Sequence, residues 1–177
     1  MNWYESVFEL IDMRSFSNLW FWIALAVMWS STSHWVLGVP WDTVMRARKE
    51  RDEDGEAARD LMDLVRINVN RVLHITNQSG LLITGFVCFA LTVMFLTGFI
   101  FGKEFAQALF LLGFPISLVA ILSVRTARRL RAEQPTGEAL FKRLHTHRVI
   151  TQVIGMISIF ITAIWGMLQN MNASVLF

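Results

Sequence analysis

The chain has 177 residues, 54% of them hydrophobic, and its 16 Lys and Arg only slightly outnumber its 14 Asp and Glu. This length predicts one domain, and the apolar content exceeds what the core of a soluble domain requires. The single cysteine, Cys88, excludes an intramolecular disulfide and is expected as a small buried apolar residue. Composition therefore favours an integral membrane protein.

Four apolar segments are long enough to cross the hydrocarbon core of a bilayer, which takes roughly 20 helical residues. They contain no Asp, Glu, Lys or Arg and lie near residues 19–37, 81–101, 105–122 and 149–167. No alternating pattern of the barrel type is present, so strands are not expected and the spans are predicted to be helices. The tight connection at 102–104 makes the second and third spans antiparallel neighbours.

The connection between the first two spans, about 41–80, predicts a helical hairpin. A short basic helix at 41–51 is followed by a turn at 52–55 and by a helix that runs from Glu56 into the second span. This long helix is expected to stand out of the membrane. One of its faces is an apolar stripe formed by Ala57, Leu61, Leu64, Val65, Val69, Val72 and Ile75. Such a stripe requires a partner helix.

The connection between the third and fourth spans, about 123–148, predicts a second hairpin, which is broken at 134–137 by Gln-Pro-Thr-Gly. Its apolar residues Ala139, Leu140 and Leu144 are the expected contacts of the stripe, so the two hairpins should pack as a small bundle. Small residues inside the spans let helices approach closely, and these are Gly85, Gly98, Gly113 and Gly155.

The basic residues orient the chain, because all but two of them lie in the two connections. Positively charged loops remain on the cytoplasmic side. The predicted localisation is therefore the bacterial inner membrane, multi-pass, with both hairpins cytoplasmic and both termini periplasmic.

The four histidines fall near one predicted level, at the cytoplasmic ends of the spans. Imidazoles from three helices could hold a transition metal, or two could ligate a haem; His34 paired with His147 or His74 is the favoured set. The simpler interpretation is interfacial histidine beside arginine. His145 and His147 are two residues apart and should face in different directions, and no Cys or carboxylate stands at ligand spacing. No cofactor is therefore expected, and haem or metal is the alternative.

The second hairpin carries a basic collar: Arg125, Arg128, Arg129, Arg131, Lys142, Arg143 and Arg148. The collar is expected to attract anionic lipid headgroups, at about 1 kcal/mol per charge, with an acidic protein partner as the alternative. Nucleic acid is not expected, because stacking aromatics do not interleave with the arginines. Acidic residues of the first hairpin, from Glu50 to Asp63, should neutralise part of the collar.

Ser and Thr side chains in the spans are expected to pack helices together, or alternatively to line the pore of a homo-oligomer. Proton relays and coupled transport usually use buried carboxylates or cations, and the spans have none. Ser33 beside His34 is no catalytic pair on a helix, because adjacent side chains point about 100° apart. The sequence therefore favours a non-enzymatic protein.

Three strings carry a resemblance: residues 16–42, which run from Phe-Ser-Asn-Leu-Trp-Phe-Trp to Val-Pro-Trp-Asp; Val65–Arg71; and Glu104–Phe110. Together they resemble a group of small alphaproteobacterial membrane proteins that are sometimes labelled a component of the Suf iron–sulfur assembly complex. The resemblance spans most of the chain but implies no mechanism and no functional residue. No cysteine stands where it could ligate a cluster, so a direct iron–sulfur role is not expected.

The predicted fold is all-α: a four-helix transmembrane bundle with cytoplasmic helical-hairpin extensions, forming one integral membrane domain over 1–177. The predicted function is an accessory, assembly or scaffolding subunit of a larger membrane complex. The alternatives are a homo-oligomeric small channel and a haem- or metal-binding membrane protein. The expected partners are the lipid bilayer and either further copies of the chain or a larger complex.

Overall fold

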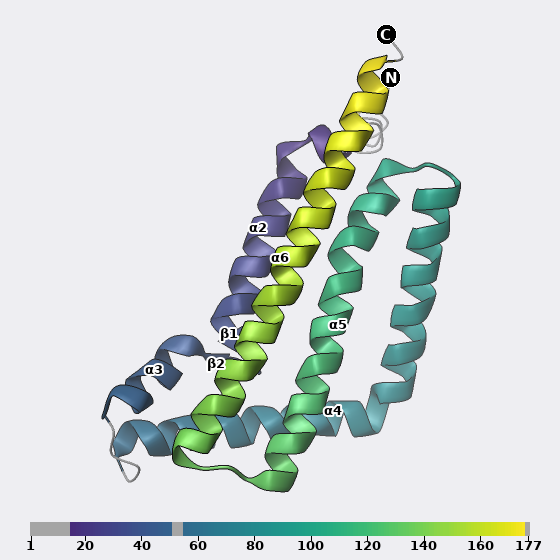
Figure 1. Ribbon diagram of the computed structural model, residues 1–177. Coiled ribbons are helices and arrows are strands. Elements are labelled where there is room, and N and C mark those ends of the chain that lie inside the picture. The colour runs from purple at the N-terminus through teal and green to yellow at the C-terminus, as the bar shows by residue number, and fades with distance from the viewer. Residues whose placement is uncertain (1–14, 51–54, 176–177) are drawn as a thin grey trace, which may run out of the picture. The chain divides into compact units, whose positions relative to one another are not determined.

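The computed structural model describes residues 15–50 and 55–175, with side chains up to Met171 (Figure 1). The all-α prediction is confirmed, because nearly all of the described chain is helical. In order, the elements are η1 (Ser15–Ser17), α2 (Leu19–His34), β1 (Trp35–Val36), β2 (Val39–Pro40), α3 (Trp41–Glu50), α4 (Glu56–Phe95), the π-helical turn η2 (Leu96–Ile100), α5 (Glu104–Glu133) and α6 (Gly137–Val175).

Three of the described helices are long and apolar enough to cross a membrane: α4 continued through η2, α5, and α6 as far as Met171. The remaining predicted span, 19–37, corresponds to α2, which has 16 residues. At 1.5 Å per residue this helix is about 24 Å long, somewhat shorter than the hydrocarbon core. The helix at the predicted first span is therefore shorter than that span, and it is not among the three described helices that are long and apolar enough to cross a membrane.

The segment after α2 departs from the prediction because it contains two short antiparallel strands, with Trp35 opposite Pro40 and Val36 opposite Val39. The turn between the strands has positive φ angles at Leu37 (52°) and Gly38 (79°), as two-residue hairpin turns of the primed type require. The expectation that the chain has no strands was wrong here, because it considered only strands of membrane-barrel length.

The chain divides into two compact units, and α2, α4, α5 and α6 each contribute to both. The first unit is 1–29, 84–117 and 154–177, and the second is 30–83 and 118–153.

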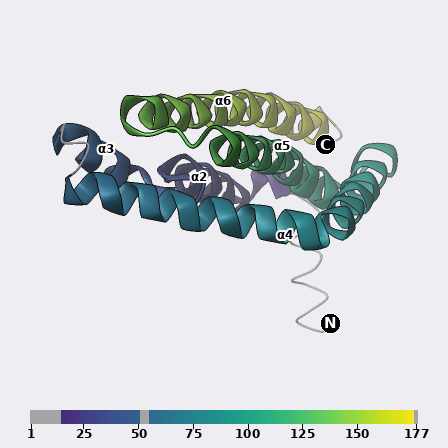
Figure 2. The same cartoon turned by 90° about the horizontal axis from the view of Figure 1, so that it is seen from below.

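The second unit contains the predicted bundle of hairpins. Its buried core joins α3, α4, α5 and α6 through Val44, Ala47, Ala57, Leu61, Val65, Val69, Leu73, Ala127, Leu130, Leu140 and Leu144, together with residues of the β-hairpin. Figures 1 and 2 show α3 beside the first turns of α4, and the α4 segment of this unit running across α5 and α6. The stripe on α4 thus finds its partners as predicted, except that Ile75 and Ala139 are exposed and Leu73 is buried instead.

The α4 segment lies across its partner helices, whereas the sequence suggested a helix that stands out of the membrane beside them. The helix–turn boundaries were predicted well: α5 ends at Glu133, α6 begins at Gly137, and α5 starts at Glu104 after the tight turn. The predicted turn at 52–55 lies mostly outside the described residues.

The first unit is held by a buried polar node at Gln107, which is 4% exposed. The amide Nε2 of Gln107 donates to the carbonyl oxygen of Gly98 at 2.8 Å, and its Oε1 accepts from Trp165 Nε1 at 3.0 Å. Gly98 lies in η2, and a Cβ placed there would stand 2.8 Å from the backbone nitrogen of Gln107. Glycine is therefore required where this π-helical turn contacts α5.

The same unit has a close contact between α6 and α2. A Cβ on Gly155 would stand 2.7 Å from Cε3 of the Trp29 ring, so the predicted close approach at Gly155 is confirmed. The prediction was wrong for Gly85, around which nothing lies within 4 Å, and for Cys88, which is exposed.

Candidate functional site

A polar cluster surrounds the end of α2 in the second unit, and Arg148 of α6 is its centre. The Arg148 Nε donates to the carbonyl oxygen of Ser33 at 3.3 Å. Ser33 belongs to the last turn of α2, where carbonyl groups lack helical partners and a cation is favourable. The guanidinium carbon also lies 4.3 Å from the centroid of the Trp41 ring, a cation–π contact. Arg148 therefore links α6 to the end of α2 and to the Trp41 ring.

Gln152, one helical turn after Arg148, adds a second attachment to the same residue. Its Nε2 donates to the Ser33 hydroxyl oxygen at 3.1 Å. The sequence placed Ser33 and Gln152 in a general set of polar span residues and gave no sign that they meet. Because both bonds reach Ser33 from one face of α6, they fix the C-terminal end of α2.

The β-hairpin carries the chain from α2 to Trp41 and is fastened by α4. Asn68 of α4 donates from Nδ2 to the carbonyl oxygen of Gly38 at 3.3 Å. A Cβ on Gly38 would stand 2.8 Å from Asn68 Oδ1, so glycine is needed for space as well as for its φ of 79°.

The histidines have separate surroundings in this unit. His34 Nε2 lies 3.8 Å from Asp42 Oδ2, His145 lies beside the Trp41 ring with centroids 6.0 Å apart, and His74 is exposed. His147 is buried, and its Nδ1 lies 3.0 Å from the Thr126 hydroxyl oxygen. His145 is exposed and His147 is buried, in agreement with the prediction that the two side chains face in different directions. Within residues 15–50 and 55–171, no three His, Cys, Asp or Glu side chains form a group that could hold a metal ion.

Burial changes the proton affinity of His147, which precedes the predicted span at 149–167. Removal from water disfavours the charged imidazolium and lowers the pKa of His147 to about 4. The ring is therefore neutral at pH 7, and one ring nitrogen can accept a hydrogen bond while the other donates.

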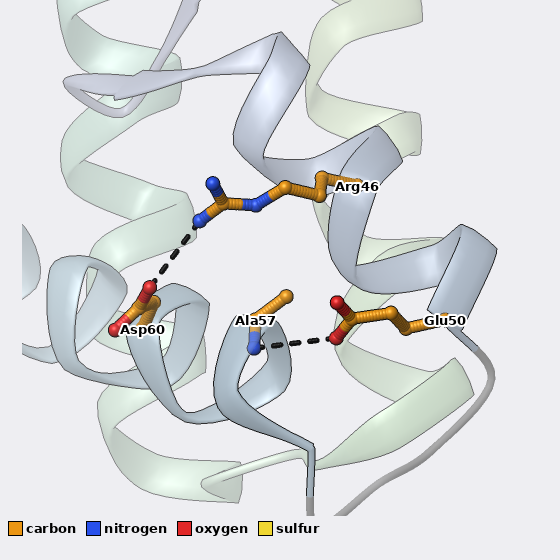
Figure 3. Close-up of polar contacts among 4 residues, drawn as sticks. All are labelled: Arg46, Glu50, Ala57 and Asp60. Carbon is orange, nitrogen blue, oxygen red and sulfur yellow. Dashed lines mark hydrogen bonds and ion pairs between the residues drawn. The ribbon is translucent and has the colours of Figure 1, made fainter.

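Three acidic residues of the first hairpin, Glu50, Asp60 and Asp63, have partners within that hairpin. Arg46 of α3 donates to Asp60 of α4 at 3.2 Å, and the Glu50 carboxylate accepts the backbone N–H of Ala57 at 3.3 Å. Figure 3 shows both contacts. One turn further along α4, Asp63 pairs with Arg66 at 2.9 Å. The expectation that Asp60 and Asp63 neutralise the collar was therefore wrong. Asp52, Glu53 and Asp54 lie outside the described residues.

The collar residues divide into engaged and available cations. Arg143 pairs with Glu133 at 2.7 Å, Arg131 donates to Asn70 Oδ1 at 3.4 Å, and Arg148 belongs to the cluster above. The other four are exposed and form no ion pair with any described residue: Arg125, Arg128, Arg129 and Lys142.

A groove in the second unit was not foreseen from the sequence. It has a volume of about 390 Å³ and lies between α4 and the α5–α6 turn. Its lining combines apolar and polar side chains, among them Met62, Val65, Arg66, Asn70, Arg131, Gln134 and Pro135. No local pattern marks it, because its walls come from three separate helices.

Three hydroxyl side chains of α6 are buried, whereas that of Thr146 is exposed. Thr151, Ser158 and Thr162 recur on one face with Gly155, and all three are buried, Thr162 completely. A pore shared between copies of the chain would need these side chains on the outer surface. The buried face of α6 does not favour the channel alternative, although Ser30 and Ser31 of α2 are exposed.

Comparisons with known proteins do not extend this description. The chain matches no protein-family model, no curated protein and no solved structure.

Proposed function

We propose that this chain is a multi-pass membrane protein that serves as a non-enzymatic accessory, assembly or scaffolding subunit. The proposed arrangement is a four-helix transmembrane bundle made by α2, the apolar parts of α4 with η2, α5 and α6. The proposed setting is the bacterial inner membrane, with the hairpin bundle in the cytoplasm and both termini in the periplasm.

The observation that supports a subunit role is the exposure of α4. Among the 18 most apolar consecutive residues of this helix none is buried, whereas 28% of the corresponding residues of α5 and of α6 are buried. Its large side chains Leu81, Leu82, Phe86 and Phe89 are each more than 60% exposed. This span therefore contributes little to the packing of its own chain.

Lipid tails can cover an apolar helix, so exposure alone permits a monomer. Bulky Phe side chains present a large area to a neighbouring helix, and packing between helices is what drives association in a bilayer. The proposal is that α4 packs against helices of a different membrane protein. Because the sequence contains no catalytic motif, holding that partner is the activity proposed.

Photo-crosslinking in native membranes tests this proposal. A photoreactive phenylalanine analogue replaces Phe86 or Phe89 in separate variants, and the matched control carries it at Phe160, which is 67% exposed on α6. The expected result is one protein adduct of defined mass from both α4 positions and no protein adduct from Phe160. Mass spectrometry of the adduct identifies the second polypeptide.

Each other outcome contradicts the proposal in a distinct way. An adduct of twice the chain mass of 20.3 kDa would show self-association in place of a heterologous complex. Lipid adducts alone at all three positions would show a span that is surrounded only by lipid.

A further inference from the structure

The outer faces of α5 and α6 change character at a defined level. On α5 the exposed residues Phe114, Leu118 and Ile121 follow one another at spacings of four and three, and Arg125 continues the same face. Arg128 and Arg129 come one turn later. This face therefore changes from apolar to cationic within a single helical turn.

The outer face of α6 shows the same change in the opposite chain direction. Lys142 is followed on its own face by Val149, Val153 and Phe160, all exposed. Lys142 and Arg128 are each seven residues from Pro135 in the α5–α6 turn. Because the two helices run antiparallel from this turn, these two cations lie at about the same level.

The cations at this level are not neutralised by the acidic residues near them in the sequence. Their acidic neighbours in the sequence are occupied elsewhere, since Glu133 pairs with Arg143 and Glu138 lies 3.7 Å from Arg48. Arg125, Arg128, Arg129 and Lys142 form no ion pair with the described carboxylates. A ligand that completes this surface carries an anion directly beside a hydrocarbon chain.

We propose that these four residues form a binding site for the phosphate groups of anionic phospholipids, whose acyl chains lie along the exposed apolar faces of α5 and α6. The guanidinium fork matches phosphate oxygens in a bidentate geometry, and the ammonium group of lysine binds phosphate as a point charge. An acidic protein would satisfy the charges but not the apolar faces beside them. The inference rests on the proposed membrane placement and adds lipid selectivity to it.

Native mass spectrometry of the full chain tests this site. The protein is released from nanodiscs made of equal parts phosphatidylglycerol and phosphatidylcholine, and the ratio of the two lipids that it retains is measured. The site variant replaces Arg125, Arg128, Arg129 and Lys142 by Gln. The matched control replaces three arginines of the same unit that are already engaged in ion pairs, namely Arg46, Arg48 and Arg66.

The expected result is preferential retention of phosphatidylglycerol by the wild type and the control. At about 1 kcal/mol per charge near a membrane surface, each removed charge should lower that preference about 5-fold. A variant with Lys at the three arginine positions keeps the charge and should keep most of the preference. Raising the salt concentration should weaken the preference in the wild type.

Three outcomes would overturn the site: equal retention of both lipids by the wild type, an unchanged ratio in the Gln variant, or an equal loss in the control. A wild type that retains lipid without selectivity leaves the membrane placement intact and removes only the lipid site. A wild type that enters no nanodisc removes both.

Discussion

Substitution of Gly155 by Ala should destabilise the first unit, because the added methyl group meets the Trp29 ring. Its Cβ would stand 2.7 Å from Cε3 and 3.1 Å from both Cδ2 and Cζ3, against an ordinary carbon–carbon contact of about 3.5–4.0 Å. Trp29 is 7% exposed, so the ring has little room to move. Overpacking of this kind costs about 1–3 kcal/mol, and the higher helix propensity of Ala returns about 0.5–1 kcal/mol. The expected net loss is about 1 kcal/mol.

Gly85 provides the matched control, since it lies in a helix with nothing within 4 Å of its hypothetical Cβ. Gly85→Ala should be neutral or stabilising by up to about 1 kcal/mol. Unfolding of the detergent-solubilised protein by heat or denaturant measures both variants. Trp29→Leu in the Gly155→Ala background should recover part of the loss, giving a favourable coupling energy in the double-mutant cycle. If Gly155→Ala were as stable as Gly85→Ala, the described contact between α6 and α2 would be incorrect.

Four further predictions use the same unfolding measurement. Leu61→Ala should cost about 2–5 kcal/mol of stability, because Leu61 is 1% exposed. Leu81 is 89% exposed, so Leu81→Ala should change stability by less than about 0.5 kcal/mol. Similar values for the two variants would contradict the placement of Leu61 in the core. Gly38→Ala should cost at least about 1–2 kcal/mol, because its φ is 79° and Asn68 occupies the space, and a neutral result would contradict the hairpin turn. Gln107→Leu should cost about 1–3 kcal/mol by leaving the Gly98 carbonyl and the Trp165 N–H without partners, and a stabilised variant would refute the node. Burial lowers the pKa of His147 from 6.5 to about 4, so the unfolded chain binds more protons than the folded chain between these pH values. Stability should therefore fall as the pH decreases from 6.5 to 4. His147→Gln should reduce that pH dependence, and an unchanged pH profile in this variant would contradict the burial of the His147 ring.

Periodic features were predictable from the sequence because each repeats a local rule many times. The stripe from Ala57 to Val69 recurs every four residues, and burial follows it onward to Leu73. Since four residues advance slightly more than one helical turn, the buried line drifts around the helix, and Ile75 falls outside it. Turns containing Gly or Pro were located correctly for a similar reason, as at 134–137, where Pro135 and Gly137 end one helix and begin the next.

Contacts of the candidate site could not be predicted because they join distant residues through single side chains. Gln152 and Arg148 reach Ser33 over more than a hundred positions of sequence. Leu37 adopts a positive φ that its own side chain disfavours, so nothing in its identity indicates the hairpin turn. The available cations of the collar could not be predicted either, because they depend on which residues Asp60 and Asp63 contact. The composition determines only the total charge.

The burial pattern gives an argument for membrane placement that does not depend on hydropathy. In the second unit the ion pairs lie on the surface, as in a protein surrounded by water, although the polar residues His147 and Thr151 are buried there. In the described part of the first unit the charged residues are Lys103 and Glu104, and polar side chains such as Gln107, Ser158 and Thr162 are buried while many large apolar residues are exposed. Polar groups inside with apolar groups outside is the arrangement that a hydrocarbon solvent favours, because only partners within the protein can satisfy a hydrogen bond there, as they do for Gln107. The buried hydroxyls of Ser158 and Thr162 have no such partner among the described residues. The described part of the first unit therefore has the distribution of polar and apolar side chains that a lipid environment favours, which supports the proposed membrane placement.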